Sequence, residues 1–455
     1  MHRELIISSS GLRAKYGPEE IRNLFFGLGW ALPSKFEGDF VAGIDTRPTS
    51  LPAVESLMAG LEAAGGKVDF VGICPVSAVS HLVSEGMARS GLLVTASHNP
   101  VEWNGLKVFG RDGIIVAKET IEAIFQDASN VPITPYARLV TAKETWVKDY
   151  VSSVIDELRR LGVSADNLRI VVDVGNGSLS RISKDFLEAL GANVKILNAE
   201  IDGRFRRPIE PLPENLGRLR DEVVKQKADF GIAHDADGDR AVLVDERGKV
   251  LREDATLAAG LMTLLERVRS PLVVNFASSS LFEILASDKG VPLFYSEVGE
   301  RNLVMRMKEV GSIVGGEGSC GGVVYTKLSH TRDGLLASGL VAGLIREKGP
   351  LSKALSKYLN FFVSKATFNY RPTSIEFSKL VQSLKQEMPQ VKHVEMGDIK
   401  FIEEGGWVLI RASKTQSIIR VVAEARDQRS ADTLLRKYAP IVKKKLASAH
   451  SENSL

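Results

Sequence analysis

The sequence predicts an α/β protein, in which three similar α/β domains with mixed sheets precede a smaller α+β domain. Two observations support this fold class. Short apolar runs alternate with glycine-rich turns and helical stretches, and this rhythm restarts twice before the composition changes near Phe362. At 455 residues the chain is also too long for one hydrophobic core, and its length is typical of three or four domains.

The first α/β unit contains a tetrapeptide, Ser97-His98-Asn99-Pro100, directly after an apolar run. Pro100 disfavours helical geometry at residue 99, so we expect Ser97 on an exposed loop, where a nucleophile can be displayed. Such a tripeptide taken alone is more typical of a solvated turn. The elements expected around it are a strand at 41–44, a helix at 51–65 and strands at 67–72 and 91–95.

The next two units repeat this alternation, and no short fixed period indicates a solenoid. In the second unit we expect helices at 144–161 and 183–190 and strands at 168–173, 193–197, 229–233 and 241–244. In the third we expect helices at 255–267 and 280–289 and strands at 271–276 and 312–314. The last unit shows strand patterns at 392–394, 407–410 and 417–425 and a closing helix at 430–446. We therefore predict domains at 1–140, 141–250, 251–361 and 362–455.

Composition excludes several classes of partner and location. Lys+Arg exceeds Asp+Glu by only 59 − 56 = 3, so no global charge favours nucleic acid or a membrane surface. The two cysteines, Cys74 and Cys320, lie far apart in the chain, which argues against a disulfide scaffold and favours a reducing compartment. No apolar stretch approaches the ~18 residues of a membrane span, so we expect a cytoplasmic protein.

The strongest local signal is the segment Asp235-Ala236-Asp237-Gly238-Asp239-Arg240. Its three carboxylates would repel one another unless a hard cation compensated them, and all-oxygen ligands suit Mg²⁺. An acidic surface turn remains the alternative. A calcium loop of the EF-hand type does not fit, because Arg240 stands where that loop needs glycine and the flanking runs are strand-like. Arg240 and Lys107 could balance the added charge of a phosphorylated Ser97.

Two further loops carry candidate binding residues. The segment from Arg411 to Ser417, followed by Arg420, offers guanidinium, hydroxyl and ammonium donors that suit a phosphate, although such loops also occur on ordinary surfaces. Glu317 lies among the glycines of segment 315–322, where it could accept sugar hydroxyls or be an incidental loop residue.

Taken in order, these motifs resemble the α-D-phosphohexomutase superfamily, which includes phosphomannomutase/phosphoglucomutase and phosphoglucosamine mutase. The resemblance covers essentially the whole chain. It rests on Ser10-Gly11-Leu12-Arg13, Thr95-Ala96-Ser97-His98-Asn99-Pro100, the Asp235–Arg240 loop, Gly316-Glu317-Gly318-Ser319 and the Arg411-x-Ser413-x-Thr415 loop. It implies four domains around a central cleft.

The resemblance also implies a reaction and a role for each motif. The expected activity is interconversion of hexose 1-phosphate and hexose 6-phosphate, of glucose, mannose or glucosamine, through a phosphoserine and a hexose bisphosphate. The hexose phosphates and the hexose bisphosphate would be the partners of the protein. The protein itself would be a monomer or a homodimer. The implied catalytic residues are Ser97, His98, Lys107, Arg13 and Arg240, and the Mg²⁺ ligands are Asp235, Asp237, Asp239 and the phosphorylated Ser97. Glu317 and Ser319 would bind the sugar, and Arg411, Ser413, Lys414, Thr415 and Arg420 the other phosphate.

The chain departs from the family pattern in three places. Ala14 follows Arg13 where glycine is usual, and Cys320-Gly321 follow Ser319 where Gly-His is common. The phosphate loop has Lys414, Gln416 and Ser417 where Gly-Thr-Glu-Pro is common. Two alternatives follow: a Mg²⁺-dependent sugar phosphatase and a non-catalytic sugar-phosphate sensor. Both rank below the mutase because Ser97 and the three aspartates are intact.

Overall fold

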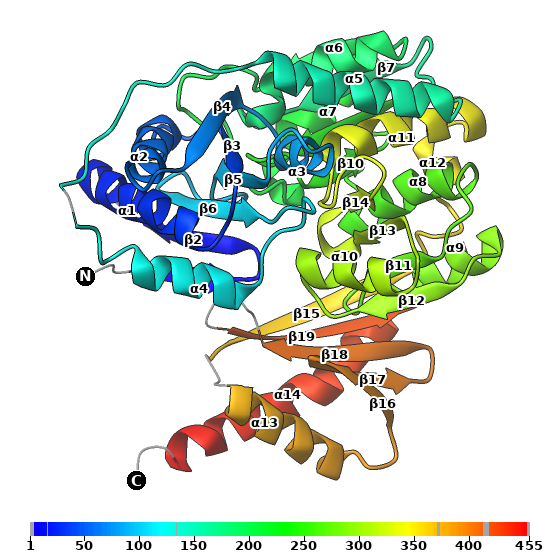
Figure 1. Ribbon diagram of the computed structural model, residues 1–455. Coiled ribbons are helices and arrows are strands. Elements are labelled where there is room, and N and C mark those ends of the chain that lie inside the picture. The colour runs from blue at the N-terminus through cyan, green and yellow to red at the C-terminus, as the bar shows by residue number, and fades with distance from the viewer. Residues whose placement is uncertain (1–3, 16, 133, 371–373, 413–417, 453–455) are drawn as a thin grey trace.

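The computed structural model describes residues 4–15, 17–132, 134–370, 374–412 and 418–452. Within these residues the strands form four sheets, which follow one another along the chain (Figure 1). The first sheet has six strands, the second and third have four each, and the fourth has five. Three α/β units and a smaller C-terminal unit confirm the predicted fold class. Each sheet lies within one predicted domain, while the boundaries between the domains stay a prediction.

The first sheet is mixed and has the strand order β1-β2-β6-β5-β3-β4. Strand β3 runs parallel to β4 and β5, and the remaining pairs are antiparallel. The strands are β1 (Leu5–Ser8), β2 (Gly11–Lys15), β3 (Asp39–Ile44), β4 (Lys67–Ile73), β5 (Ser90–Val94) and β6 (Trp103–Phe109). The helices are α1 (Pro18–Ala31), α2 (Ser50–Ala63), α3 (Val76–Ser84) and α4 (Lys118–Asp127). The sequence pattern does not predict the hairpin β1–β2, because strands this short show little periodicity.

The second and third sheets repeat part of this topology. The second sheet, β10-β9-β7-β8, matches the β6-β5-β3-β4 part of the first sheet. The third sheet matches it when read from the opposite edge, as β14-β13-β11-β12. Each has two parallel pairs and one antiparallel pair. The second unit has β7 (Arg169–Asp173), β8 (Asn193–Leu197), β9 (Phe230–His234), β10 (Ala241–Val244), α5 (Thr145–Arg160), α6 (Ser183–Ala189) and α7 (Gly217–Gln226). The third has β11 (Leu272–Asn275), β12 (Leu293–Ser296), β13 (Val314–Glu317), β14 (Gly322–Tyr325), α8 (Glu253–Leu265), α9 (Leu281–Lys289), α10 (Glu300–Glu309), α11 (Gly334–Lys348) and α12 (Leu351–Ala354). The predicted rhythm therefore reflects a repeated topology.

This repetition places three sequence motifs at equivalent positions. In each α/β unit the motif lies on the hairpin loop between the last two strands in chain order. Ser97 follows β5, the three aspartates follow β9, and Glu317 ends β13 just before the short 3₁₀ helix Gly318–Cys320. The motifs are far apart in sequence, yet the shared topology gives each unit one such loop.

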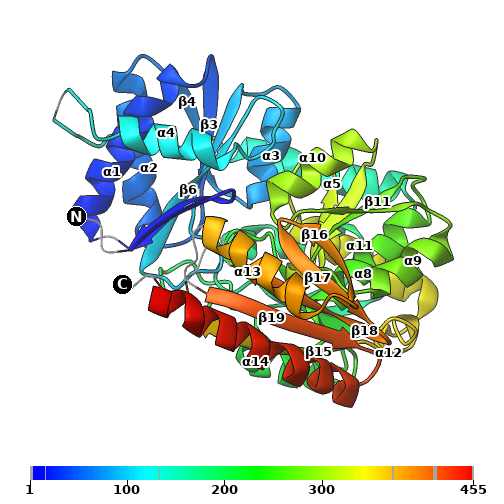
Figure 2. The same ribbon diagram turned by 90° about the horizontal axis from the view of Figure 1, so that it is seen from below.

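The fourth unit is an antiparallel sheet with the order β15-β19-β18-β17-β16. Two helices cover one face of this sheet, and the other face is turned toward the rest of the molecule (Figures 1 and 2). The elements are β15 (Phe362–Asn369), β16 (Lys392–Met396), β17 (Asp398–Glu403), β18 (Gly406–Ala412), β19 (Ile418–Ala425), α13 (Ser374–Glu387) and α14 (Gln428–Glu452). The predicted closing helix is therefore confirmed.

The hydrophobic core divides unequally among the four units. One large cluster of buried side chains runs through the second and third units and reaches α3 of the first. Helix α5 shows why: Val147, Tyr150, Val154 and Leu158 are buried at helical spacing and join this cluster. The C-terminal unit has its own core, and a small cluster that includes Phe276 and Trp407 connects it to the third unit. The C-terminal unit is thus the most independently packed one.

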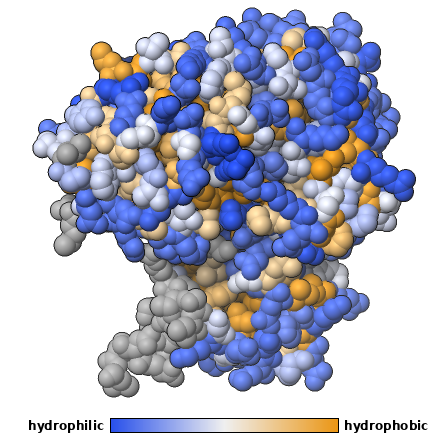
Figure 3. Space-filling model, viewed as in Figure 1, coloured by the Kyte–Doolittle hydropathy of each residue, from blue (hydrophilic) through white to orange (hydrophobic). Residues whose placement is uncertain are grey.

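On the face seen in Figure 3, hydrophilic residues predominate and apolar ones are scattered between them. Among the described residues, no helix combines the length and the apolar character needed to cross a bilayer.

Candidate active site

Ser97 lies between β5 and β6, and it is buried. The residue exposes 1% of its surface, which corrects the expectation of an exposed loop. The reason is tertiary, because the loop after β9 meets it and Ser97 Oγ donates a hydrogen bond to Asp235 Oδ2 at 3.1 Å. The φ of 51° is unusual for a serine, and such backbone strain is often found at functional sites. The hydroxyl is therefore shielded from bulk water and faces an acidic loop.

Arg47, just after β3, holds the Ser97 loop through its backbone. Its guanidinium donates hydrogen bonds to four backbone carbonyl oxygens, two of which belong to Ser97 and Asn99 at 2.7 Å each. Arg47 Nε also pairs with Asp45 Oδ2 at 3.0 Å, and neither side chain is exposed. Asp45 in turn accepts a hydrogen bond from Thr95 Oγ1, which itself accepts one from the Ser97 amide. This network fixes the strained loop.

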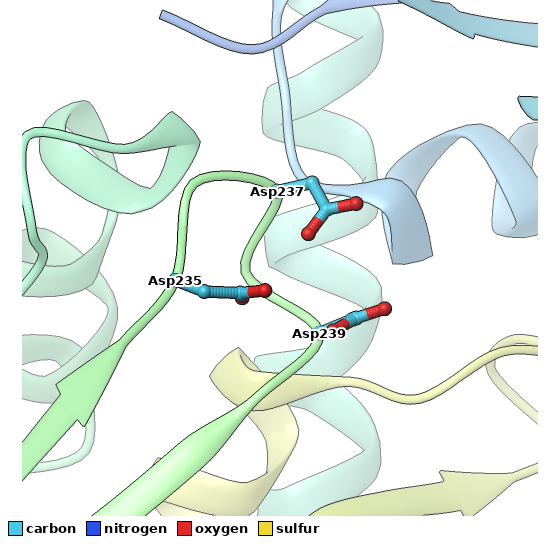
Figure 4. A group of neighbouring side chains, drawn as sticks. All are labelled: Asp235, Asp237 and Asp239. Carbon is cyan, nitrogen blue, oxygen red and sulfur yellow. The ribbon is translucent and has the colours of Figure 1, made fainter. Parts of the chain in front are cut away.

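The three aspartates converge on one small space. Asp235, Asp237 and Asp239 are fully buried on the loop between β9 and β10, and their side chains lie near one another (Figure 4). One ligand oxygen from each lies within 4.8 Å of the others. Oδ1 of Asp237 and Oδ1 of Asp239 have no hydrogen-bond partner, although both are buried. Buried carboxylate oxygens without donors fit a cation, so these residues can hold a metal ion.

Cationic side chains from the first and second units surround this acidic loop. Lys107 Nζ, on β6, lies 2.8 Å from Asp237 Oδ2 and 3.2 Å from Asp239 Oδ2. Arg13, on β2, donates a hydrogen bond to Asn99 Oδ1 at 2.7 Å, and it is buried as well. Arg240 pairs with Glu210 at 2.5 Å. The site therefore gathers positive charge beside both the hydroxyl and the carboxylates.

The pKa values reflect this crowding. Burial, together with Asp239 and Asp237, raises the pKa of Asp235 to about 8. Burial also opposes ionisation of Asp239, but Arg332 and Lys107 outweigh it and hold the pKa of Asp239 below its ordinary value. Burial alone would lower the pKa of Lys107, yet Asp237 and Asp239 raise it. Lys107 therefore stays charged, while Asp235 can carry a proton near neutral pH.

His98 is held as a neutral imidazole beside Ser97. Burial and the neighbouring Arg240 and Arg13 lower its pKa well below the usual value for histidine. Arg240 Nη2 lies 3.3 Å from His98 Nε2, and since a guanidinium can only donate, Nε2 accepts and Nδ1 carries the proton. Nδ1 lies 3.4 Å from Ser97 Oγ. His98 can therefore donate to the serine oxygen.

Glu317 is a buried and well-anchored carboxylate. Its Oε1 accepts hydrogen bonds from Asn275 Nδ2 and from the Gly299 amide, each at 3.0 Å. Its Oε2 accepts one from Arg332 Nη1 at 2.6 Å. A flexible loop with an incidental glutamate does not fit these contacts. The side chain of the neighbouring Ser319 lies outside the described part of the structure.

The basic loop of the C-terminal unit is described only at its edges. Arg411 and Arg420 are directly paired across β18 and β19, so their side chains lie on the same face. Burial and the neighbouring Arg411 lower the pKa of Arg420. Two like charges in such positions repel one another, and an anion between them would relieve the repulsion. The predicted residues Ser413, Lys414 and Thr415 lie outside the described residues.

Comparison with known proteins places the chain in a family. Models of phosphoglucomutase/phosphomannomutase match at four places: alpha/beta/alpha domains I, II and III at residues 5–132, 148–248 and 253–362, and the C-terminal domain at 378–440. A "Probable phosphoglucosamine mutase" of Methanopyrus kandleri is 32% identical over 449 residues, with 96% of this chain and 97% of the relative covered. The chain belongs to the α-D-phosphohexomutase superfamily. A phosphoglucosamine mutase of Frankia alni is also 32% identical, with 89% of this chain and 87% of the relative covered.

Membership of the α-D-phosphohexomutase superfamily makes the chain an enzyme of the intramolecular phosphotransferase class. Its fold agrees with a crystal structure of a phosphoglucomutase/phosphomannomutase family protein from Burkholderia thailandensis. The TM-score is 0.83 and 97% of both chains are covered, at 21% sequence identity. At that identity the likeness supports the fold alone.

Sequence reasoning missed two arginines of this phosphohexomutase site. Arg47 and its partner Asp45 follow the carboxyl end of the strand predicted at 41–44, and polar residues at the carboxyl ends of strands in α/β sheets often serve a ligand site. That position was a usable signal. Arg332, which contacts Asp239 and Glu317, lies in no motif, and nothing in its local sequence indicates its partners.

Proposed function

We propose that the protein interconverts hexose 1-phosphate and hexose 6-phosphate through a phosphorylated Ser97 and a hexose bisphosphate. The observation that carries the proposal is the buried hydroxyl of Ser97, which lies 3.1 Å from Asp235 Oδ2 of the aspartate cluster and 3.4 Å from His98 Nδ1. Exclusion of water favours transfer of a phosphoryl group to a sugar hydroxyl over hydrolysis. Burial therefore favours a mutase over a sugar phosphatase.

In the proposed transfer, the bond between phosphorus and Ser97 Oγ breaks as a bond forms to the free hydroxyl oxygen of the sugar. The hydroxyl loses one proton and Ser97 Oγ gains one, so the step needs no external acid or base overall. His98 Nδ1 faces Oγ and can donate a hydrogen bond to the leaving oxygen. Lys107, charged at neutral pH, stabilises negative charge on the transferring group together with Arg13 and Arg240. The same steps in reverse return the other phosphate to Ser97.

Asp235, Asp237, Asp239 and the phosphorylated Ser97 would hold Mg²⁺, which suits an all-oxygen ligand set. When bound, this cation would neutralise charge on the phosphoryl oxygens. The unpartnered oxygens of Asp237 and Asp239 support this assignment.

The remaining residues would hold the rest of the substrate. Glu317 and Ser319 would contact sugar hydroxyls, and Arg411 and Arg420, with the loop between them, the phosphate that is not transferred. The bisphosphate must exchange its two ends between the steps. The separate core of the C-terminal unit supports a hinge motion that loosens this second phosphate contact.

The Ser97→Ala variant tests the nucleophile. We expect no isomerised product even when a hexose bisphosphate is supplied, and no phosphoryl group on the protein by intact-mass spectrometry. Ser84→Ala, on α3 of the same unit, is the control and should keep wild-type turnover. Turnover near wild type in Ser97→Ala would overturn the assignment.

Substrate and metal can be tested on the wild-type enzyme. Turnover on glucose, mannose and glucosamine 1-phosphates, measured side by side, identifies the preferred sugar. Activity should be lost in EDTA and restored by Mg²⁺. Release of inorganic phosphate without isomerised product would instead indicate a sugar phosphatase. Tight binding of all three sugar phosphates without turnover would indicate a sensor.

A further inference from the structure

Arg332 occupies a central position that no sequence motif indicates. It lies between β14 and α11, and its side chain exposes 12% of its surface. Its aliphatic part runs across the backbone of Gly322, where a Cβ atom would lie 2.4 Å from Arg332 Cδ and 2.6 Å from Cγ. A larger residue at position 322 would collide with the Arg332 side chain where it now lies. The glycine-rich stretch after Glu317 therefore allows this position of the arginine.

The Arg332 guanidinium contacts three carboxylates that come from three different elements. Nη2 donates to Asp239 Oδ2 on the loop after β9, and Nη1 donates to Glu317 Oε2 at 2.6 Å at the end of β13. Nε lies 3.0 Å from Oε2 of Glu300, the first residue of α10. Such a set of contacts requires the planar fork of an arginine, because a lysine ammonium is a single point charge.

The contacts of Arg332 have different consequences at Glu317 and at Asp239. At Glu317, Asn275 and Gly299 already hold Oε1, so Arg332 fixes the second oxygen and with it the plane of the carboxylate. At Asp239, Arg332 and Lys107 both use Oδ2, which leaves Oδ1 for a cation. The same guanidinium also places a positive charge next to a cation site, and like charges disfavour binding there.

We propose that Arg332 is a positioning residue that joins the metal site to the sugar site. It orients Glu317 toward sugar hydroxyls, and it weakens cation binding at the aspartate cluster. The inference rests on the proposed function, because it takes the aspartates as metal ligands and Glu317 as a sugar contact. The new element is that Arg332 strengthens binding of the sugar phosphate and weakens binding of the cation.

Binding measurements on Arg332→Gln and Arg332→Lys test this inference. Mn²⁺ alone is titrated by electron paramagnetic resonance, and glucose 1-phosphate and glucosamine 1-phosphate by calorimetry in EDTA, where no turnover is expected. For Arg332→Gln we expect Mn²⁺ to bind at least fivefold more tightly and the sugar phosphates at least tenfold more weakly. For Arg332→Lys, which keeps the charge, we expect the Mn²⁺ affinity within twofold of wild type and the same loss of sugar affinity.

A matched control separates this role from a structural one. Arg267 is buried to a similar degree, with 14% of its side chain exposed. It pairs with Glu347 and donates hydrogen bonds to the backbone of Leu161 and Thr263, so its contacts do not include the three aspartates. Arg267→Gln should change neither affinity. Parallel weakening of both ligands in Arg332→Gln, or unchanged sugar affinity in Arg332→Lys, would overturn the inference. Should Arg332→Gln not fold, the lysine variant decides alone. Wild-type protein that binds neither Mn²⁺ nor either sugar phosphate would instead refute the proposed function.

Discussion

Replacing Arg47 with methionine removes the guanidinium that holds the Ser97 loop and leaves Asp45 buried without its ion pair. Breaking a fully buried pair from one side typically costs about 3–5 kcal/mol. Asp45 keeps hydrogen bonds from Ser50 and Thr95, which offset part of this loss, so we expect a destabilisation of about 3 kcal/mol. The four carbonyl oxygens that Arg47 contacts lose the hydrogen bonds from its guanidinium at the same time.

Activity should fall for a separate reason. The φ of 51° at Ser97 is held by these contacts, so the loop can relax when they are removed. A displacement of about 1 Å at a reacting group can cost roughly 100-fold in rate, and we expect a fall in kcat of that order. The affinity for the hexose phosphate should change little, because the contacts of Arg47 are with Asp45 and the backbone of the Ser97 loop and not with the residues proposed to bind the sugar or its second phosphate.

The double variant Asp45→Asn with Arg47→Met separates stability from positioning. Removing the unpaired charge should recover most of the lost thermal stability, whereas kcat should stay low because no guanidinium holds the carbonyl oxygens of the Ser97 loop. Thermal unfolding by circular dichroism and steady-state turnover at 25 °C measure the two effects. Arg267→Met is the control for a general loss of stability. A single variant Arg47→Met with kcat within threefold of wild type would refute the positioning argument.

Four further predictions follow from the structure. Burial lowers the pKa of Lys400 from 10.5 to about 8, so its charged form destabilises the fold below pH 8 and this effect disappears above pH 10.5. Lys400→Met should therefore melt at a higher temperature than wild type at pH 7, with a smaller difference at pH 10; equal melting temperatures at pH 7 would contradict this. A Cβ at Gly105 would lie 2.0 Å from the Leu12 carbonyl oxygen, so Gly105→Ala should lower the melting temperature and separate β2 from β6, as hydrogen exchange would show. Arg420→Ala should raise KM for the hexose phosphate at least tenfold with a smaller change in kcat; an unchanged KM would exclude it from the phosphate contact. Because burial and the neighbouring Asp239 and Asp237 raise the pKa of Asp235, Mg²⁺ binding at neutral pH should release protons and weaken as the pH falls, which calorimetry in two buffers can measure.

The local pattern of the sequence predicted most elements of the second unit. The strands β7, β8, β9 and β10 lie within one residue of the predicted ranges, because each is a short apolar run bounded by turn residues. The hairpin β1–β2 escaped prediction, although it carries Arg13. Strand β1 pairs with β2, and β2 pairs with β6, about 90 residues later in the chain, so a long-range contact that no local pattern indicates joins the hairpin to the sheet.

The candidate site shows the same division. Ser97, the three aspartates and Glu317 were predicted because each lies in a motif of a few consecutive residues, and those residue types carry their chemistry with them. The burial of Ser97 was wrongly predicted, since it depends on the aspartate loop of another unit.

The sequence by itself determined the fold class, the family resemblance and the loops that carry the reactive groups, since all three depend on residues close together in the chain. Only the tertiary structure decided which charges meet. Arg47 contacts the Ser97 loop some fifty residues away, and Arg332 joins Asp239, Glu300 and Glu317. Such pairings arise when segments far apart in the chain pack together, within one unit or between units, and no local pattern of residues encodes the distance between their side chains.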